Sequence, residues 1–187
     1  MLEGRAAGEI ETRFAFDGSA IIEGIFPYNE RASFGSDRFE TFAEGAFAES
    51  VQDGTADIHL LWQHDMGKPL ASRAGGSLTL NDAGNALRFE ARVSADHMKI
   101  GFIADAVAAM QTNLVKGLSP GFRVASAKDQ TVTRDGKGNV LRTIKRAELI
   151  ELSAVTRAAY PYGQIQARNW SPEPSARSVH VLSRWRA

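Results

Sequence analysis

Gly117-Leu118-Ser119-Pro120-Gly121-Phe122-Arg123-Val124-Ala125 is a run in which apolar and polar residues alternate once the proline is passed. Alternation with a period of two is typical of a β-strand that buries one face. The run therefore predicts a strand that carries a serine near its start. Glycine and proline on both sides of Ser119 also fit an ordinary turn serine, so the run alone makes Ser119 a candidate nucleophile and nothing firmer.

The same run matches the pattern Gly-x-Ser-x-Gly, which in α/β-hydrolases exposes a serine on a sharp turn from a strand into a helix. That interpretation requires a helix directly after Ser119 and a histidine later in the chain. The alternation argues against the helix, and the only later histidine is His180, in a tail rich in Ser, Pro and Arg. A small-molecule serine esterase that depends on His180 stays an alternative.

The remainder of the chain indicates many short strands and few helices. Asp17-Gly18 is typical of a hairpin turn, and helical spacing of apolar residues is confined to residues 44–51 and 98–110. We therefore expect an α+β, mainly β fold: a small closed or nearly closed β-barrel with one main helix and a short second helix. The expected strands are residues 11–16, 20–26, 58–63, 69–72, 77–80, 86–93, 118–127 and 140–155, with a break at 135–138.

Composition limits the classes of function. We expect residues 1–167 to form one domain and residues 168–187 a flexible C-terminal tail. The chain has no cysteine, which excludes disulfides and a thiol nucleophile and fits a reducing cytoplasm. Lys plus Arg and Asp plus Glu are 22 each, so the charge does not predict nucleic-acid binding. No run is apolar enough to span a membrane, and no motif predicts a metal or a cofactor.

A serine nucleophile needs a base within hydrogen-bond reach, because a hydroxyl is a poor nucleophile at neutral pH. Among the four histidines, His64 ends the apolar strand Leu60-Leu61-Trp62, where a side chain can project from a rigid element into a cleft. A histidine at a strand end can also be merely solvated. The other three lie inside a predicted strand (His59), at the start of the main helix (His97) and in the tail (His180).

Four motifs follow one another along the chain: Glu44-Gly45-Ala46-Phe47; Leu60-Leu61-Trp62-Gln63-His64-Asp65 with Pro69-Leu70-Ala71-Ser72; Gly117-Leu118-Ser119-Pro120-Gly121-Phe122; and Glu148-Leu149-Ile150-Glu151-Leu152-Ser153-Ala154-Val155-Thr156 with Ala158-Ala159-Tyr160-Pro161. Together they resemble the motifs of HK97-type phage prohead proteases. The resemblance covers residues 20–167, and four loose motifs in the right order are far more specific than any one of them.

The resemblance implies a role for three residues. His64 is similar to the family's general base, Ser119 to its nucleophile, and Glu151 to the third member, which orients the imidazole and stabilises its protonated form.

Other residues compete for the third role. Glu148 lies three residues from Glu151 on the predicted strand, so we expect it to point to the opposite face. Asp65 is a weaker rival, because a side chain next to His64 usually projects away from it. Glu151 itself could instead pair with Arg123 or Arg146 across a sheet.

Two positions depart from the family's pattern. Pro120 has no backbone N–H and cannot help to stabilise an oxyanion. Candidate donors are the N–H of Gly121, a loop amide or a side chain. Arg157 stands where the family commonly has an apolar residue; it is either a second candidate oxyanion group or a surface charge.

The resemblance implies a serine endopeptidase that cleaves the scaffold-like N-terminal segment of the major capsid protein during prohead maturation, with a barrel related to that of herpesvirus assemblins. It further implies self-cleavage or self-association, a place inside the immature capsid in the host bacterial cytoplasm, and a phage, prophage or gene transfer agent as source. The tail can serve as a scaffold-docking or self-cleaved segment. A catalytically silent assembly module of the same fold and a non-enzymatic binding barrel stay open.

Overall fold

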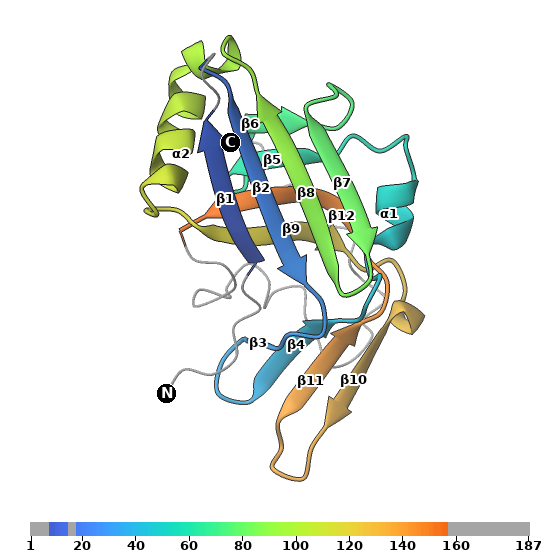
Figure 1. Cartoon of the computed structure of the whole chain (residues 1–187). Coiled ribbons are helices and arrows are strands. Elements are labelled where there is room, and N and C mark those ends of the chain that lie inside the picture. Colours follow the sequence, from blue (N-terminus) through green and yellow to red (C-terminus); the bar gives the residue numbers. More distant parts are fainter. Residues whose placement is uncertain (1–7, 15–17, 157–187) are drawn as a thin grey trace.

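The computed structural model describes residues 8–14 and 18–156, which form mainly β-strands (Figure 1). The elements in chain order are β1 (Gly8–Phe14), β2 (Ala20–Pro27), β3 (Ala32–Ser33), β4 (Arg38–Phe42), α1 (Ala48–Gln52), β5 (His59–Trp62), β6 (Asp65–Ser72), β7 (Leu78–Ala83), β8 (Ala86–Val93), the short 3₁₀ segment η1 (His97–Lys99), α2 (Gly101–Gln111), β9 (Gly117–Arg123), a second 3₁₀ segment η2 (Ala127–Asp129), β10 (Gln130–Arg134), β11 (Val140–Ile144) and β12 (Glu148–Val155). The predicted tail, its boundary at residue 167, the Asp17 turn position, Arg157 and His180 lie outside the described residues.

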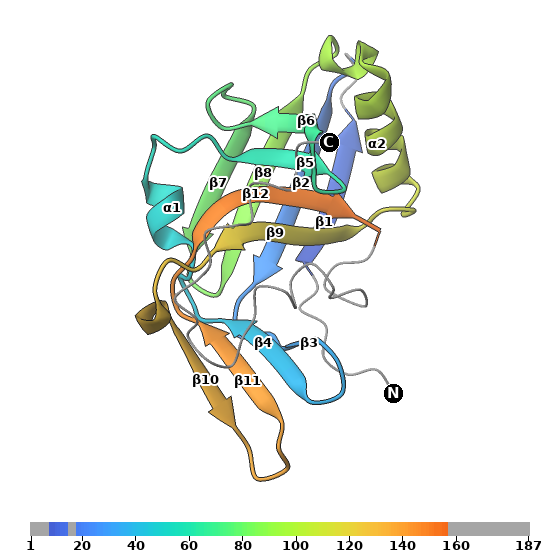
Figure 2. The same cartoon turned by 180° about the vertical axis from the view of Figure 1, so that it is seen from behind.

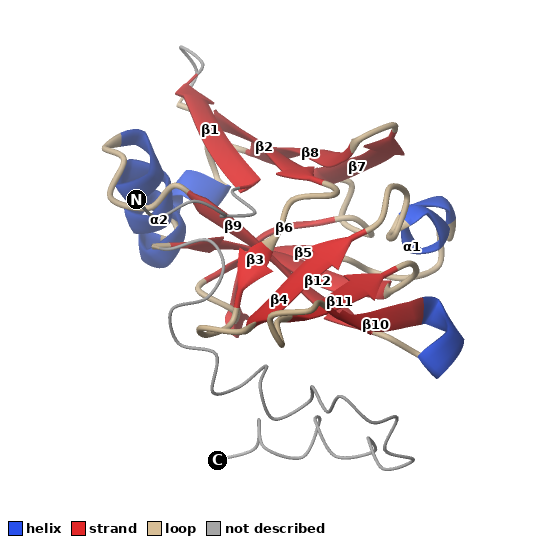
Figure 3. Ribbon diagram, turned by 90° about the horizontal axis from the view of Figure 1, so that it is seen from below, coloured by secondary structure: helices blue, strands red, loops and turns tan. Residues whose placement is uncertain are grey.

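The described strands form two sheets. The larger has the order β6-β5-β12-β9-β1-β2-β8-β7, and the smaller has the order β10-β11-β4-β3. Figure 3 shows the larger sheet folded into two layers, one with β1, β2, β8 and β7 and the other with β9, β12, β5 and β6. The layers are joined at a short seam, in which Gly8 pairs with Leu118 and Glu9 with Gly117.

The prediction of a mainly β fold with two helices is confirmed, but the closed or nearly closed barrel and its relation to assemblins are not. The end strands β6 and β7 are not paired with each other among the described residues. Strands β3, β4, β10 and β11 pair among themselves in the second sheet, so none of them bridges β6 and β7. None of the helices in the described ranges is long and apolar enough to cross a membrane.

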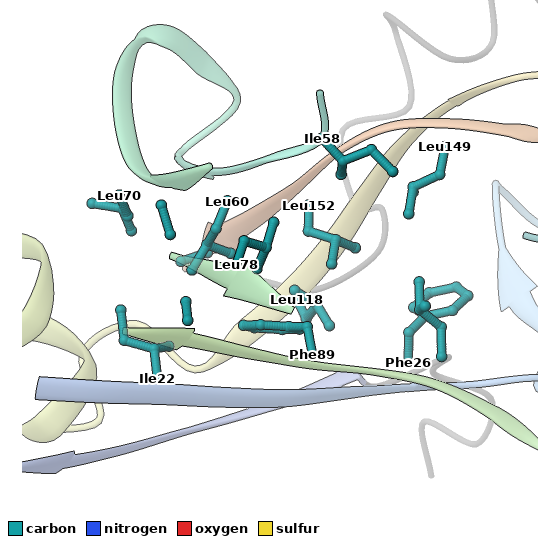
Figure 4. Close-up of a cluster of buried hydrophobic side chains, with 14 of the residues drawn as sticks. Ile22, Phe26, Ile58, Leu60, Leu70, Leu78, Phe89, Leu118, Leu149 and Leu152 are labelled. Carbon is teal, nitrogen blue, oxygen red and sulfur yellow. The ribbon is translucent and has the colours of Figure 1, made fainter. Parts of the chain in front are cut away.

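The hydrophobic core lies between the two layers (Figure 4). Leu118 of β9 and Leu152 of β12 meet Ile22 and Phe89 of the other layer, and all four side chains are buried. Helix α2 adds one apolar face to the same core, consisting of Ile103, Ala106, Val107 and Met110. Because side chains alternate along a strand, the residues next to Leu118 and Leu152 point away from this core.

Removal of the Leu152 side chain tests the placement of β12. Leu152 has no exposed surface, so Leu152→Ala leaves a cavity in the core. We expect this variant to lower the free energy of unfolding by about 2–5 kcal/mol, measured from the urea midpoint. Ile150 lies on the same strand but is 43% exposed. Ile150→Ala is the matched control, with an expected loss below about 1 kcal/mol; equal losses would contradict the placement.

Candidate active site

The candidate base His64 lies in a tight hairpin turn and not on a strand. Strand β5 ends at Trp62, which pairs with Asp65 at the start of β6, so the loop consists of Gln63 and His64 alone. Both loop residues have positive φ angles, 55° and 60°, as in a type I′ turn. Such turns favour Asn and Gly, because a side chain at positive φ costs about 1–2 kcal/mol. Backbone strain of this kind is concentrated at functional sites.

The imidazole of His64 contacts the carboxylate of Glu151. His64 Nδ1 lies 2.7 Å from Glu151 Oε1. An ionised carboxylate only accepts, so this contact assigns the ring proton to Nδ1 and leaves Nε2 of the neutral ring as the free acceptor. The Glu151 side chain is 8% exposed and the His64 side chain 39%. The arrangement can therefore remove a proton from a group placed at Nε2, while Glu151 stabilises the imidazolium that forms.

Ser119 lies one strand away on the same face. In the antiparallel pairing of β9 with β12, Ser119 is directly opposite Ser153, and Gly121 is opposite Glu151. Residues opposite each other share a face, so Ser119, Glu151 and Ser153 all lie on the side turned away from the core. Figure 2 shows β9, β12 and β5 as neighbours. Ser119 is 5% exposed, and within the described ranges no hydrogen bond joins it to His64.

A β-bulge corrects the prediction for Glu148. The register of β9 and β12 shifts between Leu149 and Glu151, so that Glu148 is opposite Arg123 while Glu151 is opposite Gly121. Arg123 and Gly121 are two residues apart and share a face, which puts both glutamates on the outer face. The expectation of opposite faces is wrong, because Ile150 is an extra, unpaired residue in the bulge and shifts the alternation of side chains between Glu148 and Glu151.

The contacts of the two glutamates distinguish them more clearly than their faces do. Glu148 is exposed and accepts a hydrogen bond from Arg123 Nε at 2.9 Å. Arg146 pairs with Glu49 and Asp129. Neither arginine therefore holds Glu151, whose carboxylate contacts His64 instead.

Asp65 is engaged in its own turn. Its carboxylate accepts the N–H of Gly67 at 2.8 Å and lies 3.4 Å from Lys68 Nζ. His59 is half-buried and 3.4 Å from Asp57, and His97 is exposed at the start of η1. These positions keep Asp65, His59 and His97 out of the His64–Glu151 contact.

Gly121 has a steric role that the sequence did not indicate. A Cβ built on Gly121 would collide with Oε1, Cδ and Cγ of Glu151. The glycine therefore leaves the space in which the Glu151 carboxylate lies against β9. Only a residue without a side chain allows this cross-strand approach.

Pro120 is accommodated without loss of a sheet hydrogen bond. Ala154 C=O accepts the N–H of Gln63 at 3.0 Å, so the backbone of Ala154 points toward β5. Backbone N–H and C=O groups point to alternate sides of a strand, so those of Ser153 and Glu151 point toward β9. Their partners opposite, Ser119 and Gly121, point their backbone groups toward β12. Pro120 lies between these two and points to the other side, where a missing N–H leaves the β9–β12 ladder intact.

Within residues 8–14 and 18–156, no group of three or more His, Asp or Glu side chains is arranged to hold a metal ion.

The sequence as a whole identifies the family. A family model described as caudovirus prohead serine protease matches residues 9–177 of the 187. The chain belongs to this family. Comparison with curated proteins and with solved structures finds no match. This membership confirms the predicted phage prohead protease family. The matched range includes the three residues predicted to be catalytic, Ser119, His64 and Glu151.

Two residues have a part in the geometry of this site that the sequence did not indicate. One is Gly121 as a space for Glu151, and the other is Ser153, which contacts both His64 and Glu151. Ser153 stands in the closing motif, so its place in that motif is the signal that could have found it.

Gly121→Ala tests the packing of Glu151 against β9. The added methyl must push the carboxylate away from His64, so we expect the hydrogen-bonded ring N–H resonance of His64 to shift or disappear in proton NMR spectra. His64→Gln identifies that resonance. Gly136→Ala is the control, because a Cβ there meets nothing within 4 Å and the residue has no positive φ. A spectrum of Gly121→Ala that is identical to the unmodified protein would contradict the packing.

Proposed function

We propose that this chain is a serine endopeptidase in which Ser119 is the nucleophile, His64 the general base and Glu151 the residue that orients His64. The observation that carries the proposal is the 2.7 Å contact between His64 Nδ1 and Glu151 Oε1, on the face where Ser119 lies on the neighbouring strand. Nucleophile, base and orienting acid are the three groups that acyl transfer by a serine requires.

The proposed mechanism has two halves. Ser119 Oγ attacks a peptide carbonyl and its proton passes to His64 Nε2, after which His64 returns the proton to the departing amine. A water molecule then attacks the acyl-enzyme, with His64 again as base, and releases Ser119. Hydrogen bonds from serine to histidine often tighten only when substrate is bound, so the separation of Ser119 and His64 fits a substrate-free site.

The source of the oxyanion donors is a separate part of the proposal. The N–H of Gly121 points toward β12, where the strand ladder competes for it. Arg157 lies outside the described residues, and both stay predictions as oxyanion groups. Loss of one such donor typically lowers kcat by about 10²–10³-fold.

The substrate we propose is the scaffold-like N-terminal segment of the major capsid protein, cleaved inside the immature capsid, with self-cleavage as a second reaction. Membership in the prohead serine protease family supports this choice. Enclosure in the immature capsid would hold protease and substrate together at high local concentration.

One observation favours a second candidate, a catalytically silent assembly module of the same fold. Ser119 is buried and makes no hydrogen bond with His64 in the described part of the chain. Pro120 also removes a backbone donor next to the nucleophile. In such a module the His64–Glu151 pair would be structural only.

Co-expression with the major capsid protein separates the two candidates. We expect the unmodified chain to remove a defined N-terminal segment from the capsid protein, seen as a lower intact mass. Ser119→Ala and His64→Gln should leave it uncut, because loss of either group from a serine triad lowers kcat by about 10⁶-fold. Glu151→Gln keeps the shape but loses the charge, and we expect a fall of about 10³–10⁴-fold.

His180→Ala is the control for the esterase alternative and should cut normally. Assembled shells that contain full-length capsid protein with every variant, the unmodified chain included, would instead identify a silent assembly module. Cleavage that survives Ser119→Ala would rule out Ser119 as the nucleophile.

A further inference from the structure

The hydroxyl of Ser153 joins both partners of the His64–Glu151 pair. Ser153 Oγ donates a hydrogen bond to Glu151 Oε2 at 2.6 Å and accepts one from the backbone N–H of His64 at 3.1 Å. Ser153 has no exposed surface. The backbone of His64, the hydroxyl of Ser153, the carboxylate of Glu151 and the imidazole of His64 thus form a closed ring of hydrogen bonds.

This ring fixes the two parts of the pair that would otherwise rotate. The bond to Glu151 Oε2 sets the plane of the carboxylate and directs Oε1 toward His64 Nδ1. The bond from the His64 N–H ties down a residue that sits at a positive φ in a two-residue loop, and so fixes the direction in which its side chain leaves the turn. A hydroxyl has one proton to donate and lone pairs to accept, so a single serine can make both contacts.

We propose that Ser153 is a positioning residue, which holds His64 in the orientation needed to take a proton from Ser119. The inference rests on the proposed function, but it concerns a residue that acts only through His64 and Glu151. Both hydrogen bonds of Ser153 Oγ go to Glu151 and to the backbone of His64, so Ser153 acts on the reaction through these two residues. Its removal should therefore lower kcat and leave KM nearly unchanged.

Ser50 of helix α1, which bonds to the backbone around the start of β12, is a merely structural serine and looks different. Ser50 Oγ accepts the N–H of Leu149 at 2.9 Å and donates to the carbonyl of Ala147 at 3.4 Å, so both partners are backbone groups near the start of β12. Ser50 is also buried. It is the matched control, because Ser50→Ala removes a buried hydroxyl and its two bonds without any contact to His64 or Glu151.

The experiment compares Ser153→Ala, Ser153→Thr and Ser50→Ala by three measurements: thermal unfolding, the His64 ring N–H resonance in proton NMR, and kcat and KM on a peptide that spans the capsid-protein cleavage site. For Ser153→Ala we expect kcat to fall by about 10–100-fold, as for a misplaced catalytic group, with KM within about twofold. The His64 resonance should shift or vanish. Ser153→Thr keeps the hydroxyl and should recover both readouts in part.

Three outcomes are decisive. Ser50→Ala should lose stability while its kcat and its His64 resonance stay as in the unmodified protein; a parallel loss of both in the two alanine variants would overturn a specific role for Ser153. A folded Ser153→Ala with normal kcat and an unchanged resonance would overturn the inference and leave the protease intact. If the unmodified chain cuts nothing, the proposed function fails, and the NMR comparison still decides whether Ser153 holds His64.

Discussion

Strand β12 is paired on both edges, and this double pairing is the constraint from which the site follows. It runs parallel to β5, with Ala154 opposite Trp62, and antiparallel to β9, with Ser153 opposite Ser119. Its core-facing residues are held between the layers by apolar packing. With one face fixed in this way, the other face must place Glu151 and Ser153 between the turn that carries His64 and the strand that carries Ser119, since a slip of one residue would exchange the two faces.

Two features of the site cost stability, a buried carboxylate and a turn with two positive φ angles. A carboxylate that is 8% exposed loses much of its hydration, and leaving it without partners would cost several kcal/mol. Glu151 recovers this through His64 and Ser153, and the turn at Gln63 and His64 accepts two positive φ angles so that His64 can take part. Glu40 and Arg142 form another buried ion pair, 2.7 Å apart. Burial raises the pKa of Glu40 even though Arg142 lies beside it, so the loss of hydration there exceeds the gain from pairing.

Much of this could be predicted from sequence where the signal is local. Alternation placed β8 and β9, helical spacing placed α2, and the ordered motifs identified the family. The parallel pairings of β12 with β5 and of β11 with β4 could not be predicted, because they join segments about 90–100 residues apart and no periodicity reports which strands become neighbours. The strand 140–155 was expected as one element, but residues 145–147 divide it into β11 and β12, which lie in different sheets.

Within the site, the sequence indicated which residues are candidates but not which side chains face or contact one another. The bulge at Ile150 cannot be read from alternation, and it reversed the expected facing of Glu148. The space at Gly121 and the ring through Ser153 depend on cross-strand register, which is a property of the assembled sheet.

The seam between the two layers is short, with Gly8 and Glu9 of β1 facing Leu118 and Gly117 of β9. Ser119 lies one residue past it, and His64, Glu151 and Ser153 lie on the same side of it as Ser119. The backbone pairings that join these four residues therefore all lie within the β9-β12-β5-β6 layer, and none of them crosses the seam. The mutual placement of the reactive groups is therefore set by pairings inside one layer, and the other layer supports that layer through the seam and the core.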